Sequence, residues 1–329
     1  MKAVIPAAGV GTRLRPHTLN KPKALLPVAG KPILAHIIDD LTAAGIAECV
    51  VIIGYHGDSV RRWFGEQRPD VKMRFVEQER RLGLGHAVWT ARDALGDEPF
   101  FCILGDTILK ADYAALLQAP TSIVAVREVE DPRRFGVAET RDGRVTRFVE
   151  KPDRPTSNLA LVGAYLFRDA PALWRGMERV IREDIRTKNE YQLTDGLQQM
   201  VAEGVELRTV PVTDWYDCGK RETWLETNRV LLDREAPGPA SGGEGVRITP
   251  PCFVGAGAEL RDTRIGPHVS VGPGARLVGC DLADCIVGER STLTGCRLRA
   301  SLVGEQCRVT DVTGEINIGD FCELQGAGS

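Results

Sequence analysis

Short apolar runs alternate with amphipathic segments over residues 1–120. Four runs have the length and apolar character of buried strands: 3–5, 49–53, 73–76 and 100–104. Three segments repeat apolar residues at the spacing of a helix face: 33–44, 60–64 and 86–95. Because strands that are apolar on both faces need cover on both, this alternation predicts an α/β fold with a mostly parallel sheet and helices packed on it. In such a fold, ligands bind at the carboxyl ends of the strands.

The middle of the chain has the pattern of paired strands. Residues 135–138 and 145–148 are strand-like and flank Asp142-Gly143, a dipeptide typical of a two-residue hairpin turn. Residues 158–167 form a longer apolar run, and 207–212 predict a further strand.

The composition changes after Leu232. Residues 233–251 are rich in Pro, Gly and Ala with few apolar anchors, as expected of a linker. Further on, an aliphatic residue followed by glycine recurs at intervals close to multiples of six, in Val254-Gly255, Ile265-Gly266, Val271-Gly272, Val287-Gly288, Val303-Gly304 and Ile318-Gly319. Such repeats build a parallel β-helix, with an ordinary Gly-rich β domain as the alternative. The expected domains are therefore 1–232 and 252–329, joined by the linker 233–251.

Composition and charge narrow the class of function. The chain has 329 residues, 43% of them hydrophobic, so it can bury a large core in about two domains. Its net charge is −3 and its basic residues are dispersed, which gives no electrostatic case for nucleic acid or a membrane as partner. No apolar run reaches the roughly 18 residues of a spanning helix and the N-terminus begins with a strand, so we expect a cytoplasmic protein.

The cysteines and histidines do not indicate a metal site. There are nine cysteines without a Cys-x-x-Cys pair, and five scattered histidines. An odd count with irregular spacing predicts reduced, buried thiols rather than disulfides or zinc ligands.

A glycine-punctuated turn follows the first strand. In Pro6-Ala7-Ala8-Gly9-Val10-Gly11 the backbone can approach an anion closely and aim amide hydrogens at it, which is typical of a phosphate-binding loop. The turn lacks the closing Gly-Lys-Ser/Thr of the ATPase loop, and its glycines lack the dinucleotide spacing. Two cations follow, Arg13 and Lys23. A guanidinium fork and an ammonium group near one glycine turn suit a triphosphate or a departing pyrophosphate.

This segment resembles the signature of the sugar-1-phosphate nucleotidylyltransferases, also called nucleoside diphosphate sugar pyrophosphorylases. The elements of the signature present here are Gly9, Gly11, Thr12, Arg13, Leu14, Pro16, Pro22 and Lys23. The resemblance implies a Rossmann-like nucleotidyltransferase domain followed by a short left-handed parallel β-helix. It also implies that a hexose-1-phosphate joins a nucleoside triphosphate and pyrophosphate is released. The residues expected on the nucleotide are Ala8, Gly9, Gly11 and Thr12, and those on the pyrophosphate are Arg13 and Lys23.

Two carboxylates are candidates for a magnesium site. Asp106 follows the run that ends at Leu104, so it emerges at the carboxyl end of a predicted strand, where a Mg²⁺ that bridges nucleotide phosphates needs an oxygen ligand. An ordinary turn-forming aspartate is the alternative. Trp215-Tyr216-Asp217-Cys218-Gly219 resembles the family's aromatic-x-aspartate-x-glycine segment, which implies that Asp217 joins Asp106 in binding Mg²⁺.

The resemblance places the sugar phosphate against the middle of the chain. Glu150-Lys151-Pro152 matches a family segment whose lysine holds the sugar phosphate and whose glutamate holds sugar hydroxyls, and both roles fit because hydroxyls donate well to a carboxylate. An exposed charged turn is the alternative. The further sugar contacts expected from the resemblance are Gly136, Gly163 and Tyr165.

Residues 188–195 match the family segment that opens a helix beside the sugar, and Thr194 or Asp195 is the candidate cap of that helix. In the bacterial thymidylyltransferases this segment commonly begins with an arginine that helps to hold the sugar phosphate. Lys188 stands in that place here. Lysine is positively charged, as arginine is, but it cannot donate two parallel hydrogen bonds to a phosphate.

Gln78 and Gly83 are the candidate contacts for the base. A glutamine offers a donor and an acceptor to a nucleobase edge, and the turn Gly83-Leu84-Gly85 lets backbone groups complete the pairing, as the resemblance places them on a pyrimidine. A plain helix entry is the alternative for this turn. Uracil and thymine differ by one methyl group, which an apolar pocket discriminates by only about 1–3 kcal/mol, so dTTP and UTP both stay open.

The sequence favours glucose-1-phosphate with dTTP or UTP as substrates. Mannose-1-phosphate with GTP is the main enzymatic alternative, because that branch of the family shares the Gly-Thr-Arg-Leu-Arg-Pro loop and a hexapeptide-repeat tail. A non-catalytic regulator that binds sugar nucleotides is the alternative of another class. Acetyl transfer by the β-helix is disfavoured, since His268 is its only histidine. We expect packing, regulation or assembly of a homo-oligomer as the role of the β-helix.

Overall fold

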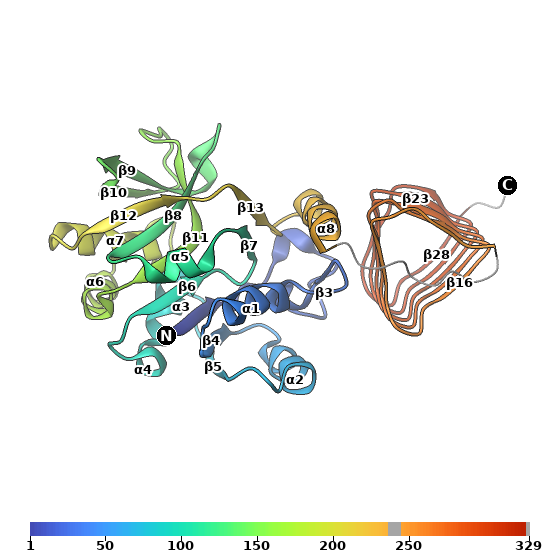
Figure 1. Cartoon of the computed structure of the whole chain (residues 1–329), viewed down its shortest axis with the longest axis horizontal. Coiled ribbons are helices and arrows are strands. Elements are labelled where there is room, and N and C mark those ends of the chain that lie inside the picture. The colour runs from blue at the N-terminus through green and yellow to red at the C-terminus, as the bar shows by residue number, and fades with distance from the viewer. Residues whose placement is uncertain (236–244, 327–329) are drawn as a thin grey trace. The chain divides into compact units, whose positions relative to one another are not determined.

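The computed structural model describes residues 1–235 and 245–326. A nine-stranded sheet lies at the centre of its N-terminal part. The strands are ordered β5-β4-β1-β6-β11-β8-β12-β10-β9 (Figure 1). Their bounds are β1 (Lys2–Pro6), β4 (Glu48–Ile53), β5 (Met73–Glu77), β6 (Phe100–Ile103), β8 (Ser122–Glu128), β9 (Gly136–Arg141), β10 (Arg144–Glu150), β11 (Leu159–Phe167) and β12 (Leu207–Pro211). A separate two-stranded sheet pairs β7 (Thr107–Lys110) with β13 (Asp214–Asp217).

Half of the large sheet is parallel and half is mixed. Strands β5, β4, β1 and β6 pair in parallel, as the alternation of strands and helices predicts. Beyond them, β11 is antiparallel to both β6 and β8, and β9 and β10 form an antiparallel hairpin. Its turn is Asp142-Gly143, with φ of +53° and +74°, so the predicted hairpin is confirmed. Gly136 and Glu150 thus lie on the two strands of this hairpin, where they are register partners.

Helices connect and cover these strands (Figure 1). Their bounds are α1 (Ile33–Ala43), α2 (Gly57–Gln67), α3 (Leu84–Thr90), α4 (Arg92–Leu95), α5 (Tyr113–Gln118), α6 (Ala170–Arg182) and α7 (Leu193–Ala202). The single helix predicted over residues 86–95 is divided at Ala91, where the backbone has φ −86° and ψ 0°. The Thr90 hydroxyl donates to the Ala87 carbonyl at 2.6 Å, a local bond that competes with the helical ladder and bends helices.

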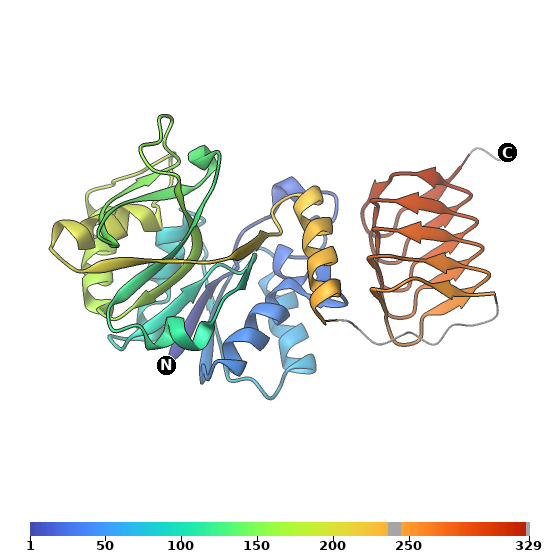
Figure 2. The same cartoon turned by 45° about the horizontal axis from the view of Figure 1, so that its top comes forward.

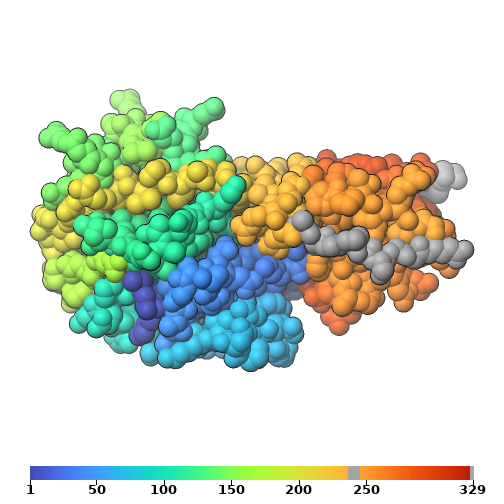
Figure 3. Space-filling model, in the orientation of Figure 1, coloured from blue at the N-terminus to red at the C-terminus, as the bar shows by residue number. Residues whose placement is uncertain are grey.

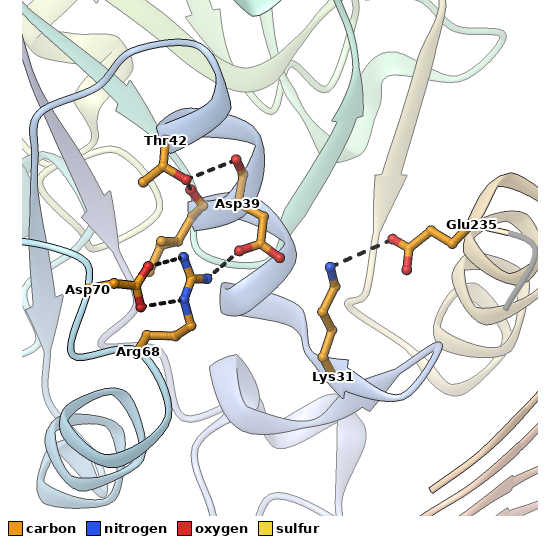
Figure 4. Close-up of polar contacts among 7 residues, drawn as sticks. Lys31, Asp39, Thr42, Arg68, Asp70 and Glu235 are labelled. Carbon is orange, nitrogen blue, oxygen red and sulfur yellow. Dashed lines mark hydrogen bonds and ion pairs between the residues drawn. The ribbon is translucent and has the colours of Figure 1, made fainter.

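Arg68 joins α1 to the chain that follows α2. Its Nη1 donates to Asp39 on α1, and its Nε and Nη2 each lie 3.1 Å from an oxygen of Asp70 (Figure 4). The hydrogen bonds to Arg68 hold the pKa of the Asp70 carboxyl below its usual value. In the space-filling view, the blue surface of α1 and the light-blue surface of α2 lie next to each other (Figure 3).

The chain divides into two compact units, and the division falls within the glycine loop, between Gly9 and Val10. The first unit comprises Met1–Gly9 and His36–Tyr216, and the second comprises Val10–Ala35 and Asp217–Ser329. In the second unit, helix α8 (Arg221–Glu235) packs on the short strand β2 (Pro27–Val28), which pairs with β3 (Lys31–Pro32). The indole N–H of Trp224 donates to the Pro27 carbonyl at 2.8 Å, and Lys31 Nζ lies 3.9 Å from a Glu235 oxygen (Figure 4).

The C-terminal repeats form stacked coils, as predicted (Figure 2). The first parallel sheet contains β14 (Arg247–Ile248), β17 (Arg264–Ile265), β20 (Asp281–Ala283), β23 (Arg297–Arg299) and β26 (Thr313–Gly314). The second contains β15 (Cys252–Val254), β18 (Val269–Val271), β21 (Ile286–Val287), β24 (Leu302–Val303) and β27 (Asn317–Ile318). The third contains β16 (Glu259–Arg261), β19 (Arg276–Val278), β22 (Thr292–Thr294), β25 (Arg308–Thr310) and β28 (Glu323–Gln325). Three parallel sheets of this kind are consistent with a left-handed β-helix.

The coils are shorter than three full hexapeptides. Stacked positions Leu260, Leu277, Leu293, Val309 and Leu324 are 17, 16, 16 and 15 residues apart. The repeat irregularity seen in the sequence is therefore a shortening of successive coils. All nine cysteines are free thiols and eight of them are buried, as expected, and burial raises the pKa of Cys285 to about 11.

The two ends of the predicted linker, residues 233–251, include residues of regular elements. Helix α8 continues to Glu235, and strand β14 already begins at Arg247, while residues 236–244 lie outside the described residues. Composition indicated a linker because α8 ends in a charged stretch and β14 is short. No helix within residues 1–235 or 245–326 has both the length and the apolar character needed to cross a membrane.

Leu293 provides a test of coil packing. Its side chain is fully buried between Leu277 and Val309 of the neighbouring coils. Because Leu293→Ala leaves a cavity, it should lower the free energy of unfolding of the β-helix by about 2–5 kcal/mol. Chemical denaturation followed by circular dichroism measures this, with the exposed Thr294→Ala as control. Equal effects of the two substitutions would show that the interior is not close-packed.

Candidate active site

Asp106 lies just beyond the end of β6, beside the start of the glycine loop. Strands β1 and β6 are neighbours in the sheet, and the backbone N–H of Gly105 donates to the Pro6 carbonyl at 3.0 Å. This is the placement predicted from the carboxyl ends of two parallel strands. Ala8 is buried, whereas a side chain at Gly9 would meet no atom within 4 Å, so the backbone there is open to a ligand.

The second half of the loop folds back on itself at Gly11. This glycine has φ of +66°, and a Cβ on it would lie 3.2 Å from the Cβ of Lys23. The Thr18 hydroxyl donates to the Gly11 carbonyl at 2.9 Å and closes the turn. The turn requires glycine and presents Lys23 next to it, while Thr12 and Arg13 are exposed.

Lys23 and Asp217 form an ion pair. Nζ lies 3.7 Å from Oδ1, with 12% and 28% of the two side chains exposed. The sequence assigns the lysine to pyrophosphate and the aspartate to Mg²⁺ in separate arguments, and the fold brings the two together.

The carboxylates of Asp106 and Asp217 suit a magnesium ion chemically. Mg²⁺ takes oxygen ligands and is usually held by one or two carboxylates together with substrate phosphates, rather than by a cage of protein groups. Across residues 1–235 and 245–326, no three or more His, Cys, Asp or Glu side chains are grouped so as to hold a metal ion. Two carboxylates completed by phosphates fit these residues, and the joint action of Asp106 and Asp217 stays a prediction.

Glu150 is the centre of the predicted sugar site. Its Oε2 accepts a hydrogen bond from the Thr194 hydroxyl at 2.6 Å, and its Oε1 lies 3.1 Å from Lys151 Nζ. A Cβ at Gly136 would come within 2.9 Å of Oε2. Only 9% of the Glu150 side chain is exposed, against 41% for Lys151. The structure thus brings Gly136, Glu150 and Lys151 together, with the carboxylate fixed and the ammonium able to reach a phosphate.

Gly163 and Tyr165 lie in the interior on β11. The side chain of Leu104 fills the space where Gly163 would carry a Cβ, at 2.6 Å, so the absence of a side chain at Gly163 makes room for Leu104. Tyr165 is 4% exposed, and burial raises its pKa. A contact of either residue with the hexose stays a prediction.

Lys188 lies on an exposed loop that is held by hydrogen bonds. It has φ of +52°, and its Nζ is 3.3 Å from Oδ1 of the exposed Asp153. Reciprocal backbone hydrogen bonds between Thr187 and Glu190 close the loop, at 3.0 and 3.2 Å. The Thr187 hydroxyl donates to Asp195 Oδ1 at 3.0 Å, which anchors the loop on α7.

The prediction that Thr194 or Asp195 caps α7 is wrong. The helix begins at Leu193 with Gln192 as its N-cap, and no side chain accepts a capping hydrogen bond there. Tertiary partners take both side chains instead, because Thr194 donates to Glu150 and Asp195 accepts from Thr187. The other oxygen of Asp195, Oδ2, is buried and has no hydrogen-bond partner among the described residues, and burial raises the pKa of this carboxyl.

Gln78 and Gly83, the predicted base contacts, are in direct contact. Gln78 Nε2 donates to the Gly83 carbonyl at 3.1 Å and lies 3.2 Å from Nδ1 of His86. Only 6% of Gln78 is exposed, so its amide group supports the turn that would face the base. Burial lowers the pKa of His86, which favours the neutral ring.

The base turn and the sugar segment are joined through Tyr191. Gly83 has φ of +116°, and a Cβ on it would lie 2.6 Å from the Tyr191 carbonyl. The N–H of Gly85 donates to that carbonyl at 2.9 Å, and the N–H of Tyr191 donates to the Leu82 carbonyl at 2.8 Å. The sequence does not indicate this connection, because backbone hydrogen bonds do not depend on which side chains the residues carry.

Comparisons with known proteins show which proteins this chain resembles. The family model described as Nucleotidyl transferase matches residues 2–234, which include every candidate site residue. The low-salt glycan biosynthesis nucleotidyltransferase Agl11 of Haloferax volcanii is 34% identical over 326 residues, with 88% of each chain covered. A glucose-1-phosphate thymidylyltransferase of Streptomyces antibioticus is 34% identical over 309 residues, which cover 86% of this chain and 85% of that protein. A solved UDP-glucose pyrophosphorylase complexed with UDP-glucose aligns with a TM-score of 0.63 at 27% identity, over 71% of this chain and 98% of that one.

The buried carboxyl of Asp195 makes stability depend on pH. Its folded pKa is raised, so its contribution to stability is present below the unfolded pKa and is lost as pH rises through the folded pKa. Asp195→Asn keeps an acceptor for Thr187 without the charge, and should raise the free energy of unfolding at pH 7 but not near pH 3.5. Denaturation at the two pH values measures this, with the exposed Asp93→Asn as control. A gain of equal size at both pH values would contradict it.

Proposed function

Because the chain belongs to the nucleotidyl transferase family and is a sugar-1-phosphate nucleotidylyltransferase, we propose that it transfers a nucleotidyl group from dTTP or UTP to glucose-1-phosphate in a Mg²⁺-dependent reaction. Two kinds of relative support this choice of substrates. One is named for glucose-1-phosphate and thymidylyl transfer, and the other was solved with UDP-glucose. The products are a nucleoside diphosphate glucose and pyrophosphate.

The proposed reaction is a single displacement at phosphorus. A phosphate oxygen of glucose-1-phosphate attacks the α-phosphorus of the triphosphate and forms the new P–O bond. The bond between that phosphorus and the oxygen bridging to the β-phosphate breaks, and pyrophosphate leaves with the electron pair. No side chain needs to bond covalently to the substrate, so the protein contributes positioning and charge stabilisation.

The observation that supports this proposal most is the Lys23–Asp217 pair against the Gly11 turn. A triphosphate with its metal ion is complementary to this pair, because a phosphate can face the ammonium group and the metal ion can face the carboxylate. Bound Mg²⁺ would neutralise charge on the phosphates, with Asp217 and Asp106 as its protein ligands. The exposed guanidinium of Arg13 adds a fork for the departing pyrophosphate.

In the proposed sugar site, the carboxylate of Glu150 is held in place and the side chain of Lys151 is partly exposed. Thr194 holds Glu150, which leaves the carboxylate oriented toward sugar hydroxyls as acceptor. Lys151, with 41% of its side chain exposed, takes the sugar phosphate, and Lys188 adds a second positive charge. This keeps the attacking phosphate oxygen from being repelled by the triphosphate.

A grid of substrates tests the proposal. Purified protein with Mg²⁺ is given dTTP, UTP, GTP, ATP or CTP with glucose-, mannose-, galactose- or N-acetylglucosamine-1-phosphate, and pyrophosphate release is measured. We expect the dominant signal with dTTP or UTP and glucose-1-phosphate. A dominant signal with GTP and mannose-1-phosphate would overturn the assignment of the base and sugar. No release anywhere, with nucleotide sugar still binding, would identify a regulator instead of an enzyme.

Substitution of Lys23 and substitution of Lys151 should affect the kinetics of different substrates. Loss of a charge-assisted contact costs about 1.5–3 kcal/mol, or roughly 10- to 150-fold. Lys23→Met should therefore lower kcat/KM for the triphosphate by that factor, and Lys151→Met should do the same for the hexose-1-phosphate. Steady-state kinetics with each substrate varied in turn measures this, with the exposed Lys72→Met as control. Wild-type rates in Lys23→Met would remove the proposed mechanism.

A further inference from the structure

The chain that follows the glycine loop is attached to the last coils of the β-helix. Residues 16–21, here called the loop arm, lie in the same compact unit as the β-helix. A Cβ at Gly319 would come within 2.9 Å of the Cβ of Pro16, so coil and loop arm are in van der Waals contact without spare room. The loop arm, which leads to Lys23, is therefore supported by a β-helix residue that lies outside the sequence signature.

Lys21 is the charged part of this attachment. It pairs with Glu305, and its Nζ lies 3.7 Å from Oδ2 of Asp320. Lys21 is 13% exposed and the Asp320 side chain 4% exposed, so the pair is largely removed from solvent. Asp320 is itself held in place, because its Oδ1 accepts the backbone N–H of Glu305 at 2.9 Å. Lys21 stands two residues before Lys23, so it limits where the Lys23 backbone can lie.

His17 adds a neutral anchor to the loop arm. It is 4% exposed, and its ring packs edge-on against Trp224 of α8 with 5.1 Å between centroids. Its Nε2 lies 2.7 Å from Asn317 Oδ1, and burial lowers the pKa of His17, which favours the neutral ring with Nε2–H as donor. His17, Lys21 and Trp224 share a cavity of about 10 Å³ with Glu305 and Asp320, room for no more than one water.

A second attachment lies near Asp217. Arg221, at the start of α8, donates through Nη2 to the Ala300 carbonyl at 2.6 Å and pairs with Glu315 of the β-helix. Arg221 follows Asp217 by four residues. Each member of the Lys23–Asp217 pair therefore has a basic residue close to it in sequence that is fixed to the β-helix.

We propose that Lys21 and Arg221 are positioning residues, through which the β-helix fixes the Lys23–Asp217 pair for binding of the triphosphate and pyrophosphate. This inference rests on the proposed role of that pair. It gives the β-helix a part in catalysis without any catalytic group of its own. Since small displacements of positioned groups lower rates strongly, weakening the attachment should affect the steps that involve polyphosphate.

Removing the two carboxylate charges that face Lys21 tests this. Full-length protein with Glu305→Gln and Asp320→Asn is compared with wild type in both reaction directions. We expect kcat/KM for the triphosphate and for pyrophosphate to fall roughly 10- to 100-fold, while KM for the hexose-1-phosphate changes less than about twofold. Lys21→Met in the same background should add little further loss, because the contact is already broken. Asp281→Asn, whose partner Arg299 lies on the same β-helix, is the matched control and should behave as wild type.

Gly319→Ala tests the attachment of the loop arm to the β-helix without changing any charge. Gly319 does not have a positive φ, and the new methyl group would meet Pro16, so it should displace the loop arm and give the same selective loss. Unchanged constants for triphosphate and pyrophosphate in both variants, or an equal fall for every substrate, would overturn the inference. Both results require an active wild type, so they leave the proposed function standing, whereas an inactive wild type defeats the proposed function itself.

Discussion

One ion pair, between the ammonium of Lys23 and the carboxylate of Asp217, joins two segments of the candidate site. The lysine belongs to the loop after β1 and the aspartate ends β13, so two segments far apart in sequence must meet for the pair to form. Both side chains are mostly covered, and a charge left alone in such a place would be costly. The turn at Gly11 lets Lys23 come close, because a side chain there would lie against the lysine. The pair thus couples the phosphate loop to the carboxylate expected to hold magnesium.

The sugar half of the site is organised by a different kind of contact. Glu150 is fixed by a neutral hydroxyl, and the base turn is fixed by backbone hydrogen bonds to Tyr191. Residues 187–195 take part in both, since Thr194 belongs to the first contact and Tyr191 to the second. A single segment therefore links the groups expected on the sugar with those expected on the base. Such a link favours a rigid, preorganised site over one assembled by each substrate separately.

The sequence could predict the elements and most of the candidate residues, because strand ends, glycine turns and repeats leave local patterns. It could not predict the mixed half of the sheet, since periodicity does not reveal how distant strands pair. The capping role expected for Thr194 was wrong because a tertiary partner, Glu150, outweighs a local preference. The attachment of Lys21 to Glu305 was equally unreadable, as it joins positions that only the fold brings together. Residues 10–35, which include Lys21, accordingly belong to the same compact unit as the β-helix.

The central claim is that this chain catalyses one direct displacement at the α-phosphorus by position and charge alone. The most direct test uses a nucleoside triphosphate that is chiral at the α-phosphorus through a sulfur substitution, and determines the configuration of the nucleoside diphosphate sugar formed. A single in-line attack by the sugar phosphate predicts inversion of configuration. Retention would mean two successive displacements through a covalent nucleotidyl-enzyme, and would contradict the account.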